Sequence, residues 1–180
     1  MASLTLGTGV TNIGLYAFAS CRSLTSVAIP ASVILLQSPV FLYCIGLTNI
    51  AVNPHNSNYC SVDGVLFNKS QTTLICYPAG KAGSCTIPAG VTNILDDSFA
   101  YCGGLASVTI PNTVKSIGGS AFWNCPSLTS VTIPNSVTRI ANRAFYECNG
   151  LTNIVQRRII SWRNSRYEVW GNGADDRVGP

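Results

Sequence analysis

Cysteine offers this chain more reactive chemistry than any other residue type, and its spacing points to a structural role. Eight cysteines occur in 180 residues, a number that normally suggests disulfides or metal ligands. Five of them share one position of a 23-residue period: Cys21, Cys44, Cys102, Cys125 and Cys148. Stacked repeats would place these thiols in a column about 4.8 Å apart, with parallel Cβ vectors that oppose disulfide formation. We therefore expect buried free thiols that pack as small apolar side chains.

The other cysteines and the single histidine do not predict a metal site. Cys85 takes a core position of a strand, whereas Cys60 and Cys76 lie on two outer strands with a third between them. A bridge between Cys60 and Cys76 would require a different strand pairing. His55 lies in a turn-like Asn-Pro-His-Asn segment, without a second histidine to complete a zinc set. We expect neither a metal nor a cofactor.

Oxygen ligands and nucleophiles are equally sparse. Asp96 and Asp97 could suggest calcium, but the repeat places both on an outer turn, where a solvated pair is the better interpretation. Serine is abundant but has no histidine and acid partner set to activate it, so we assign no catalytic residue and expect no enzyme. Asn68-Lys69-Ser70 is an N-glycosylation acceptor sequence, meaningful only in a secreted eukaryotic protein.

An internal repeat supplies the elements that position these residues. The stretch Leu-Thr-Ser-Val-Thr-Ile-Pro at 128–134 recurs as Leu-Ala-Ser-Val-Thr-Ile-Pro at 105–111 and as Leu-Thr-Ser-Val-Ala-Ile-Pro at 24–30. Shorter copies begin at Leu47 and Leu151, and each is 23 residues after the copy before it. A fixed period of this size is typical of a solenoid.

The physics of one repeat indicates how the coils stack. In Leu-x-x-Val-x-Ile, the last two apolar residues alternate with a polar one, as in a half-buried strand. Proline ends this strand because it has no amide hydrogen for the next rung of the ladder. A Val-x-x-Ile-Gly segment makes a second wall, and the Phe of Ala-Phe fills the interior. We predict a β-rich solenoid over residues 1–155, with parallel strands stacked coil on coil and mostly irregular or short-helical return segments.

An insert at about residues 53–80 interrupts this pattern. Runs at 59–62 and 65–68 flank Asp63-Gly64, a strong two-residue hairpin signal, and a third run at 73–77 ends at Pro78. We expect a small β-meander that projects from the solenoid, either as a recognition loop or as a spacer that caps one side of the coil.

Residues 156–180 depart from the repeat. Five arginines occur there among tryptophans and a tyrosine, before a polar, glycine-containing end. A cap over the last coil, a disordered tail and a sequence foreign to the repeat are the alternatives, with disorder expected from Gly171 onward.

The motif at 110–118, Ile-Pro-Asn-Thr-Val-Lys-Ser-Ile-Gly, followed by Ala121-Phe122 and Cys125, resembles the BspA-like leucine-rich repeats. The insert also resembles an element that this family carries. The resemblance covers about residues 1–155. It implies a non-enzymatic repeat protein of bacteria or protists, located at the cell surface or secreted and used in adhesion to host proteins or other cells. It implies no ligand site at the level of residues.

Charge and hydropathy exclude two classes of partner. Only 10% of the residues are charged and the net charge is +4, so the chain lacks the dense basic face of a nucleic-acid binder. Met1 is followed almost directly by repeat sequence, and we expect no signal peptide in this chain. The most apolar run, 33–47, is broken by Gln37, Ser38 and Pro39, which argues against membrane insertion.

Two surfaces are candidates for binding. The outward positions of the main strands predict a flat, hydroxyl-rich face that could bind a glycan or an extended peptide. The candidates on this face are Thr25, Ser26, Thr48, Asn49, Ser107, Thr109, Ser130 and Thr132. A second, apolar patch is predicted at Ile34, Leu35, Leu42, Ile45, Trp123 and Tyr146. A solvated sheet face and imperfect repeat packing are the respective structural alternatives.

These features favour a binding module that recognises a protein or glycan through the sheet face and the meander. The alternative is a structural spacer or scaffold that self-associates through exposed coil ends, since unpaired strand edges invite pairing.

Overall fold

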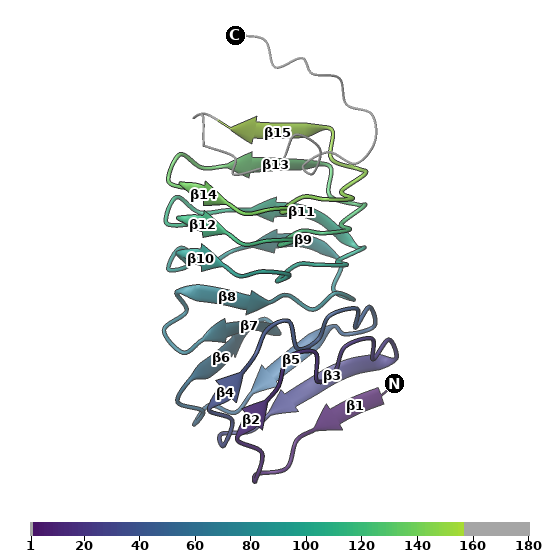
Figure 1. Ribbon diagram of the computed structural model, residues 1–180, viewed down its shortest axis with the longest axis vertical. Helices are drawn as coiled ribbons and strands as arrows, with labels where there is room; N and C mark the ends of the chain where they lie inside the picture. The colour runs from purple at the N-terminus through teal and green to yellow at the C-terminus, as the bar shows by residue number, and fades with distance from the viewer. Residues whose placement is uncertain (1, 157–180) are drawn as a thin grey trace.

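The computed structural model describes residues 2–156, which form a β-solenoid without helices (Figure 1). The main wall consists of β1 (Ala2–Thr5), β3 (Leu24–Ile29), β5 (Asn49–Val52), β9 (Gly83–Thr86), β11 (Leu105–Thr109), β13 (Ser130–Ile133) and β15 (Asn153–Gln156). A second wall contains the shorter strands β2 (Asn12–Ile13), β4 (Leu35–Leu36), β10 (Asn93–Ile94), β12 (Ser116–Ile117) and β14 (Arg139–Ile140). The insert forms β6 (Tyr59–Val62), β7 (Val65–Asn68) and β8 (Thr73–Cys76). The prediction of parallel strands stacked coil on coil is confirmed. In this part of the chain no helix could span a bilayer.

The main-wall strands pair in parallel at the 23-residue offset. Val27 lies opposite Ile50, and Val108 lies opposite Val131, all four with buried side chains. The wall is not one sheet but two, with strand orders β1-β3-β5 and β9-β11-β13-β15. No strand pairing joins β5 to β9. We call the break between these two strands the seam.

The second wall is narrow because only two residues per coil adopt strand geometry there. Ile94, Ile117 and Ile140 lie in register along it, and each side chain is buried. This wall continues from β14, β12 and β10 directly into β8, β7 and β6 of the insert, which together form a six-stranded sheet.

The return segments are irregular, and the short helices considered for them are not found in the described coils. Tyr101, Asn124 and Glu147 occupy one repeat position and have φ angles of 61°, 54° and 57°. A left-handed residue interrupts a right-handed helix, so each turn ends before a helix can propagate. The backbone bonds instead run between coils: the Phe99 amide donates to Ala121 O and the Phe122 amide to Ala144 O, both at 2.7 Å.

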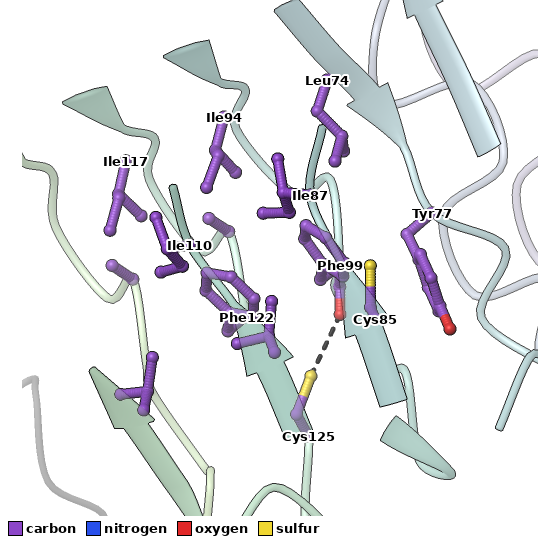
Figure 2. Packing of buried hydrophobic residues seen from close by; sticks show 14 of the residues in the cluster. Leu74, Tyr77, Cys85, Ile87, Ile94, Phe99, Ile110, Ile117, Phe122 and Cys125 are labelled. Carbon is purple, nitrogen blue, oxygen red and sulfur yellow. Dashed lines mark hydrogen bonds between the residues drawn. The ribbon is translucent and has the colours of Figure 1, made fainter. Parts of the chain in front are cut away.

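The phenylalanines of the return segments stack along the axis of the solenoid. Ring centroids of Phe99 and Phe122 are 4.7 Å apart, and those of Phe122 and Phe145 are 5.1 Å apart. Tyr77 continues the stack at 4.9 Å from Phe99. Figure 2 shows the rings of Tyr77, Phe99 and Phe122 beside isoleucines of the two walls. The Phe of Ala-Phe therefore fills the coil interior, as the repeat predicts.

The insert is a β-meander, but the expectation that it projects from the solenoid is wrong. Its strands pair antiparallel, and Asp63 and Gly64 both have positive φ (50° and 77°), as a two-residue primed hairpin turn requires. Leu66 and Leu74 are fully buried, which a projecting loop would not allow. The apolar residues on both faces of the meander draw it into the second wall, between the two sets of coils.

This placement divides the core in two. Leu66 and Ile75 pack with the buried residues of the coils before the meander, whereas Phe67, Leu74 and Tyr77 pack with those after it. Since adjacent residues of a strand point to opposite faces, β7 and β8 serve both cores at once. The cap or tail predicted for residues 156–180 lies outside the described residues, except for Gln156 at the end of β15.

Candidate binding surfaces

The repeat cysteines use their thiols within the solenoid. Cys44 Sγ donates to Phe18 O at 2.9 Å, Cys125 Sγ to Phe99 O at 3.1 Å, and Cys148 Sγ to Phe122 O at 2.9 Å. Each thiol therefore ties its coil to the preceding coil, as a small apolar residue with a weak donor can. Cys21 differs from the expectation because it is exposed, and no described coil precedes it to accept this contact.

The other residues considered for chemistry also have structural roles. Cys60 and Cys76 are free thiols, with Phe67 and Leu66 as their respective cross-strand neighbours on β7. His55 is exposed, and its backbone amide donates to Asn53 Oδ1 at 2.9 Å, as expected for a turn. No cluster of three potential metal ligands occurs among residues 2–156.

The adjacent aspartates serve the turn between coils. Asp96 Oδ1 accepts a hydrogen bond from the Gly119 amide at 2.7 Å. Burial, with a contribution from the charge of Asp96, raises the pKa of Asp97 to about 6. The side-chain amide of Asn68 is also used in hydrogen bonds within the chain. Its Nδ2 donates to Ser70 Oγ and Thr72 Oγ1, and its Oδ1 accepts from the backbone amide of Thr73.

The candidate sheet face is divided by the seam. Thr25, Ser26, Thr48 and Asn49 belong to the first sheet and its flank, and Ser107, Thr109, Ser130 and Thr132 belong to the second. Three of the hydroxyls are already used within the wall, among them that of Ser107, whose Oγ donates to Ser84 Oγ at 2.9 Å. Thr25 Oγ1 donates to Ala2 O at 3.1 Å, and Thr48 Oγ1 donates to Thr25 O at 3.2 Å. Thr109 and Thr132, in contrast, are exposed neighbours in the ladder.

The predicted apolar patch is not one surface. Ile34 and Leu35 are exposed at the second wall, and Ile45 is exposed on the turn before β5. Leu42 is half-buried on the return segment that joins them. Trp123 and Tyr146 lie beyond the seam, where their ring centroids are 6.4 Å apart. The structure therefore pairs these two aromatic residues and places them two and three coils beyond the coil of the four aliphatic ones.

Trp123 and Tyr146 belong to a longer aromatic ladder that crosses the seam. Tyr43 and Tyr101 have ring centroids 3.8 Å apart, and Tyr101 and Trp123 have centroids 5.0 Å apart. We define the aromatic ladder as these rings and Tyr146. Its end rings each meet a guanidinium: Arg22 lies 5.2 Å from the Tyr43 centroid and Arg143 lies 5.7 Å from the Tyr146 centroid. Such cation–π contacts favour an ordered stack.

The local backbone explains why these rings meet. Tyr43 and Tyr101 share one repeat position, directly before a column cysteine, and both are left-handed with φ of 65° and 61°. Trp123 and Tyr146 occupy the position before that, and Trp123 Nε1 donates to Glu147 Oε2 at 3.1 Å. Burial, the Tyr43 hydroxyl and nearby carboxylates raise the pKa of Tyr101, so its phenol stays neutral.

Sequence reasoning missed Tyr43 and Tyr101 because it aligned aromatic residues at a single repeat position. The shared Tyr-Cys dipeptide at 43–44 and 101–102 is the signal that could have revealed them. The ladder forms from two neighbouring positions because a left-handed residue redirects its side chain, which a repeat template does not encode.

Comparison with known proteins identifies the repeat. The family described as BspA type leucine rich repeat region matches residues 1–81 and 73–164, with six copies. No curated protein sequence matches the chain.

Solved structures from bacteria share the fold. A leucine-rich repeat protein from Eubacterium ventriosum superposes with a TM-score of 0.79 at 31% identity, covering 84% of this chain and 41% of that protein. The pneumococcal vaccine antigen PcpA gives a TM-score of 0.66 at 25% identity, covering 81% of this chain and 42% of that one. A leucine rich cell surface protein from Faecalibacterium prausnitzii gives 0.63 at 25% identity, with coverages of 92% and 61%. The chain thus spans about four-tenths of the first two.

Proposed function

This chain belongs to the BspA-type leucine-rich repeat family, and we propose that it is a non-enzymatic binding module that recognises a protein partner at the cell surface or after secretion. The pneumococcal antigen and the F. prausnitzii cell surface protein support this location, because both are similar over most of the chain. That the whole protein binds such a partner is part of the same proposal.

The aromatic ladder is the observation that carries this proposal. Binding energy at protein interfaces concentrates in Tyr, Trp and Arg side chains, and the ladder brings these three types together over four coils. Its rings are half-buried, except for the more deeply buried Tyr101, and stack on one another. They therefore lose little conformational entropy when a partner covers them.

The hydroxyl-rich sheet face is the second surface through which we propose recognition. Its exposed residues Thr109 and Thr132 offer hydrogen-bonding groups without charge, which suits a glycan or an extended peptide. It lacks the aromatic anchors of the ladder, so we rank it below the ladder for a protein partner.

Binding of the purified chain to host matrix proteins and to a glycan array tests the proposal. Trp123→Ser should weaken binding to a protein ligand by about tenfold or more, as expected for an interface hot spot. For a protein ligand that binds the ladder, the matched control Thr109→Lys on the sheet face should leave the affinity within about twofold. If Thr109→Lys abolishes binding and Trp123→Ser does not, the sheet face is the binding surface instead.

A scaffold function is the second candidate, and one observation favours it. In the described structure β1 pairs only with β3, and a strand edge without a partner is a template for pairing with another chain. Light scattering that shows concentration-dependent oligomers, together with no binding to any matrix protein or glycan, would support this function over adhesion.

A further inference from the structure

The seam contains a groove that the repeat alone does not produce. Its volume is about 440 Å³, within the range of pockets that bind ligands. One side is the hairpin turn of the meander with Asp63, and the other is the strand β9 with Ser84 and Thr86. The groove therefore lies between the two halves of the main wall. In the regular array, the main-wall strand of the preceding coil fills this place.

Only one of the two strands at the seam has an open edge. The Ile50 amide of β5 donates to Gly64 O at 3.0 Å, and the Val52 amide donates to Ser61 Oγ at 3.1 Å. The meander's hairpin thus covers the edge of β5. β9, in contrast, pairs only with β11 in the described structure.

The backbone of β9 shows which groups face the groove. The amides of Gly83 and Ile87 donate to Gly104 O and Thr109 O on the β11 side. Because backbone groups alternate between the two edges of a strand, the amides and carbonyls of Ser84 and Thr86 point to the opposite edge. Both residues are exposed. The edge therefore offers two donors and two acceptors in the spacing of a parallel ladder.

The inner part of the groove is apolar and contains one unsatisfied polar atom. Phe67, Leu74 and Ile87 line it with side chains that are at most 2% exposed. Tyr77 lines it as well, and its hydroxyl is buried without a hydrogen-bond partner among residues 2–156. A buried hydroxyl without a partner is costly, so a ligand group that reaches this atom would gain a hydrogen bond.

Asp63 and Lys81 are the charged residues that line the groove, and the Lys81 ammonium is the group that attracts an acidic residue. The Lys81 ammonium donates to the backbone carbonyl of Asp63 across the groove, and no carboxylate of the described chain pairs with it. Lys81 precedes β9, so this positive charge lies at the N-terminal end of the open edge.

We propose that the seam groove binds an extended peptide segment of a partner protein, which adds to β9 as a parallel strand. The segment places apolar side chains in the groove and an acidic residue beside Lys81. Its main chain pairs with Ser84 and Thr86, continuing the sheet β15-β13-β11-β9 by one strand. This mode of recognition takes affinity from main-chain hydrogen bonds and selectivity from alternate side chains.

The repeat itself supplies the probe. We would use the acetylated, amidated peptide Glu-Leu-Thr-Ser-Val-Thr-Ile, which carries the strand sequence of this array behind a glutamate, with fluorescence anisotropy and amide NMR as readouts. The amide signals of Ser84 and Thr86 should shift and gain protection from exchange. A peptide of the same sequence with N-methyl groups at the alternate amides that face β9 should bind at least about tenfold more weakly.

Two variants locate the site. Thr86→Pro removes an edge donor that makes no bond to β11 and should weaken peptide binding about tenfold. Thr5→Pro is the matched control, since Thr5 has the equivalent place on the open edge of β1: the Leu6 amide already donates to Ala28 O. It should leave the affinity unchanged. Lys81→Glu should weaken binding of the peptide that begins with glutamate and strengthen binding of the same peptide with lysine in place of glutamate.

Several results would overturn this proposal. Equal binding of the N-methylated and unmodified peptides would do so, and this comparison needs no folded variant. No peptide binding, or no change at Ser84 and Thr86, would have the same consequence. A concentration-dependent dimer that the peptide displaces would assign the groove to a second copy of this chain instead. The aromatic ladder lies outside these measurements, so its binding function stands or fails separately.

Discussion

Replacing Asn56 with alanine should loosen the attachment of the meander to the preceding coil. Asn56 is fully buried, and its amide makes four hydrogen bonds. Nδ2 donates to Pro30 O and Val33 O, both at 2.9 Å. Oδ1 accepts from the amides of Asn58 at 2.9 Å and Tyr59 at 2.8 Å. The side chain thus satisfies every polar group it has and ties β6 to the turn before β4.

The cost of this substitution follows from the groups left behind. Alanine would leave two carbonyls and two amides without their partner, at a net loss of about 1 kcal/mol each. The free energy of unfolding should therefore fall by about 4 kcal/mol. For a chain of this length, such a loss lowers the melting temperature by about 10 °C.

Urea unfolding followed by circular dichroism measures the effect. Asn58→Ala is the matched control, since the side-chain Nδ2 of Asn58 donates one solvent-exposed hydrogen bond, to Ile34 O at 2.8 Å. It should cost no more than about 1 kcal/mol. If the two variants lose the same stability, Asn56 does not join the meander to the coil and the reasoning fails.

Three further predictions concern the core, the thiols and a turn. Phe122→Ala should lower the free energy of unfolding by about 3–5 kcal/mol in urea titration, because it leaves a cavity in a fully buried stack; a loss below about 1 kcal/mol would contradict that packing. Cys21 should be the thiol that a thiol reagent labels first in the native protein, and mass spectrometry should find Cys125 labelled only after unfolding; early labelling of Cys125 would show that the column is open. The pKa of Asp97 is raised to about 6, so the ionised form of Asp97 destabilises the fold. The stability that the protonated carboxyl contributes is fully present below about pH 4 and is lost as the pH rises toward 6. Asp97→Asn should therefore stabilise the protein at pH 7 by about 1 kcal/mol, since solvent screens a half-buried carboxylate, and should flatten the dependence between pH 4 and 6; an unchanged pH profile would show that another group titrates.

The repeat could be predicted from sequence because its physics is local. Val108 and Val131 are one period apart, and stacking parallel strands brings such residues into register without further information. The turn at Asp63-Gly64 was predictable for the same reason, since two positive φ angles favour this pair of residues.

The features that depend on contacts between unlike segments could not be predicted. Asn56 lies in a polar stretch that reads as a turn, yet its amide is buried against a coil more than 20 residues earlier. The meander enters the wall because Leu66 and Phe67 have different cores to face, which period and hydropathy do not show. The ladder required the left-handed backbone at Tyr43 and Tyr101.

The two-sided packing of β7 and β8 has a consequence for how such a protein can change in length. Leu66 and Ile75 close one core, while Phe67 and Leu74 close the other. Each set of coils is therefore sealed at the meander by its own layer of side chains. Duplication or loss of a 23-residue unit away from the seam on one side should leave the core on the other side intact, since the contacts that cross the seam, such as the stacking of Tyr43 on Tyr101, are made by the coils next to it. The meander acts as a fixed partition from which two arrays can be lengthened or shortened independently.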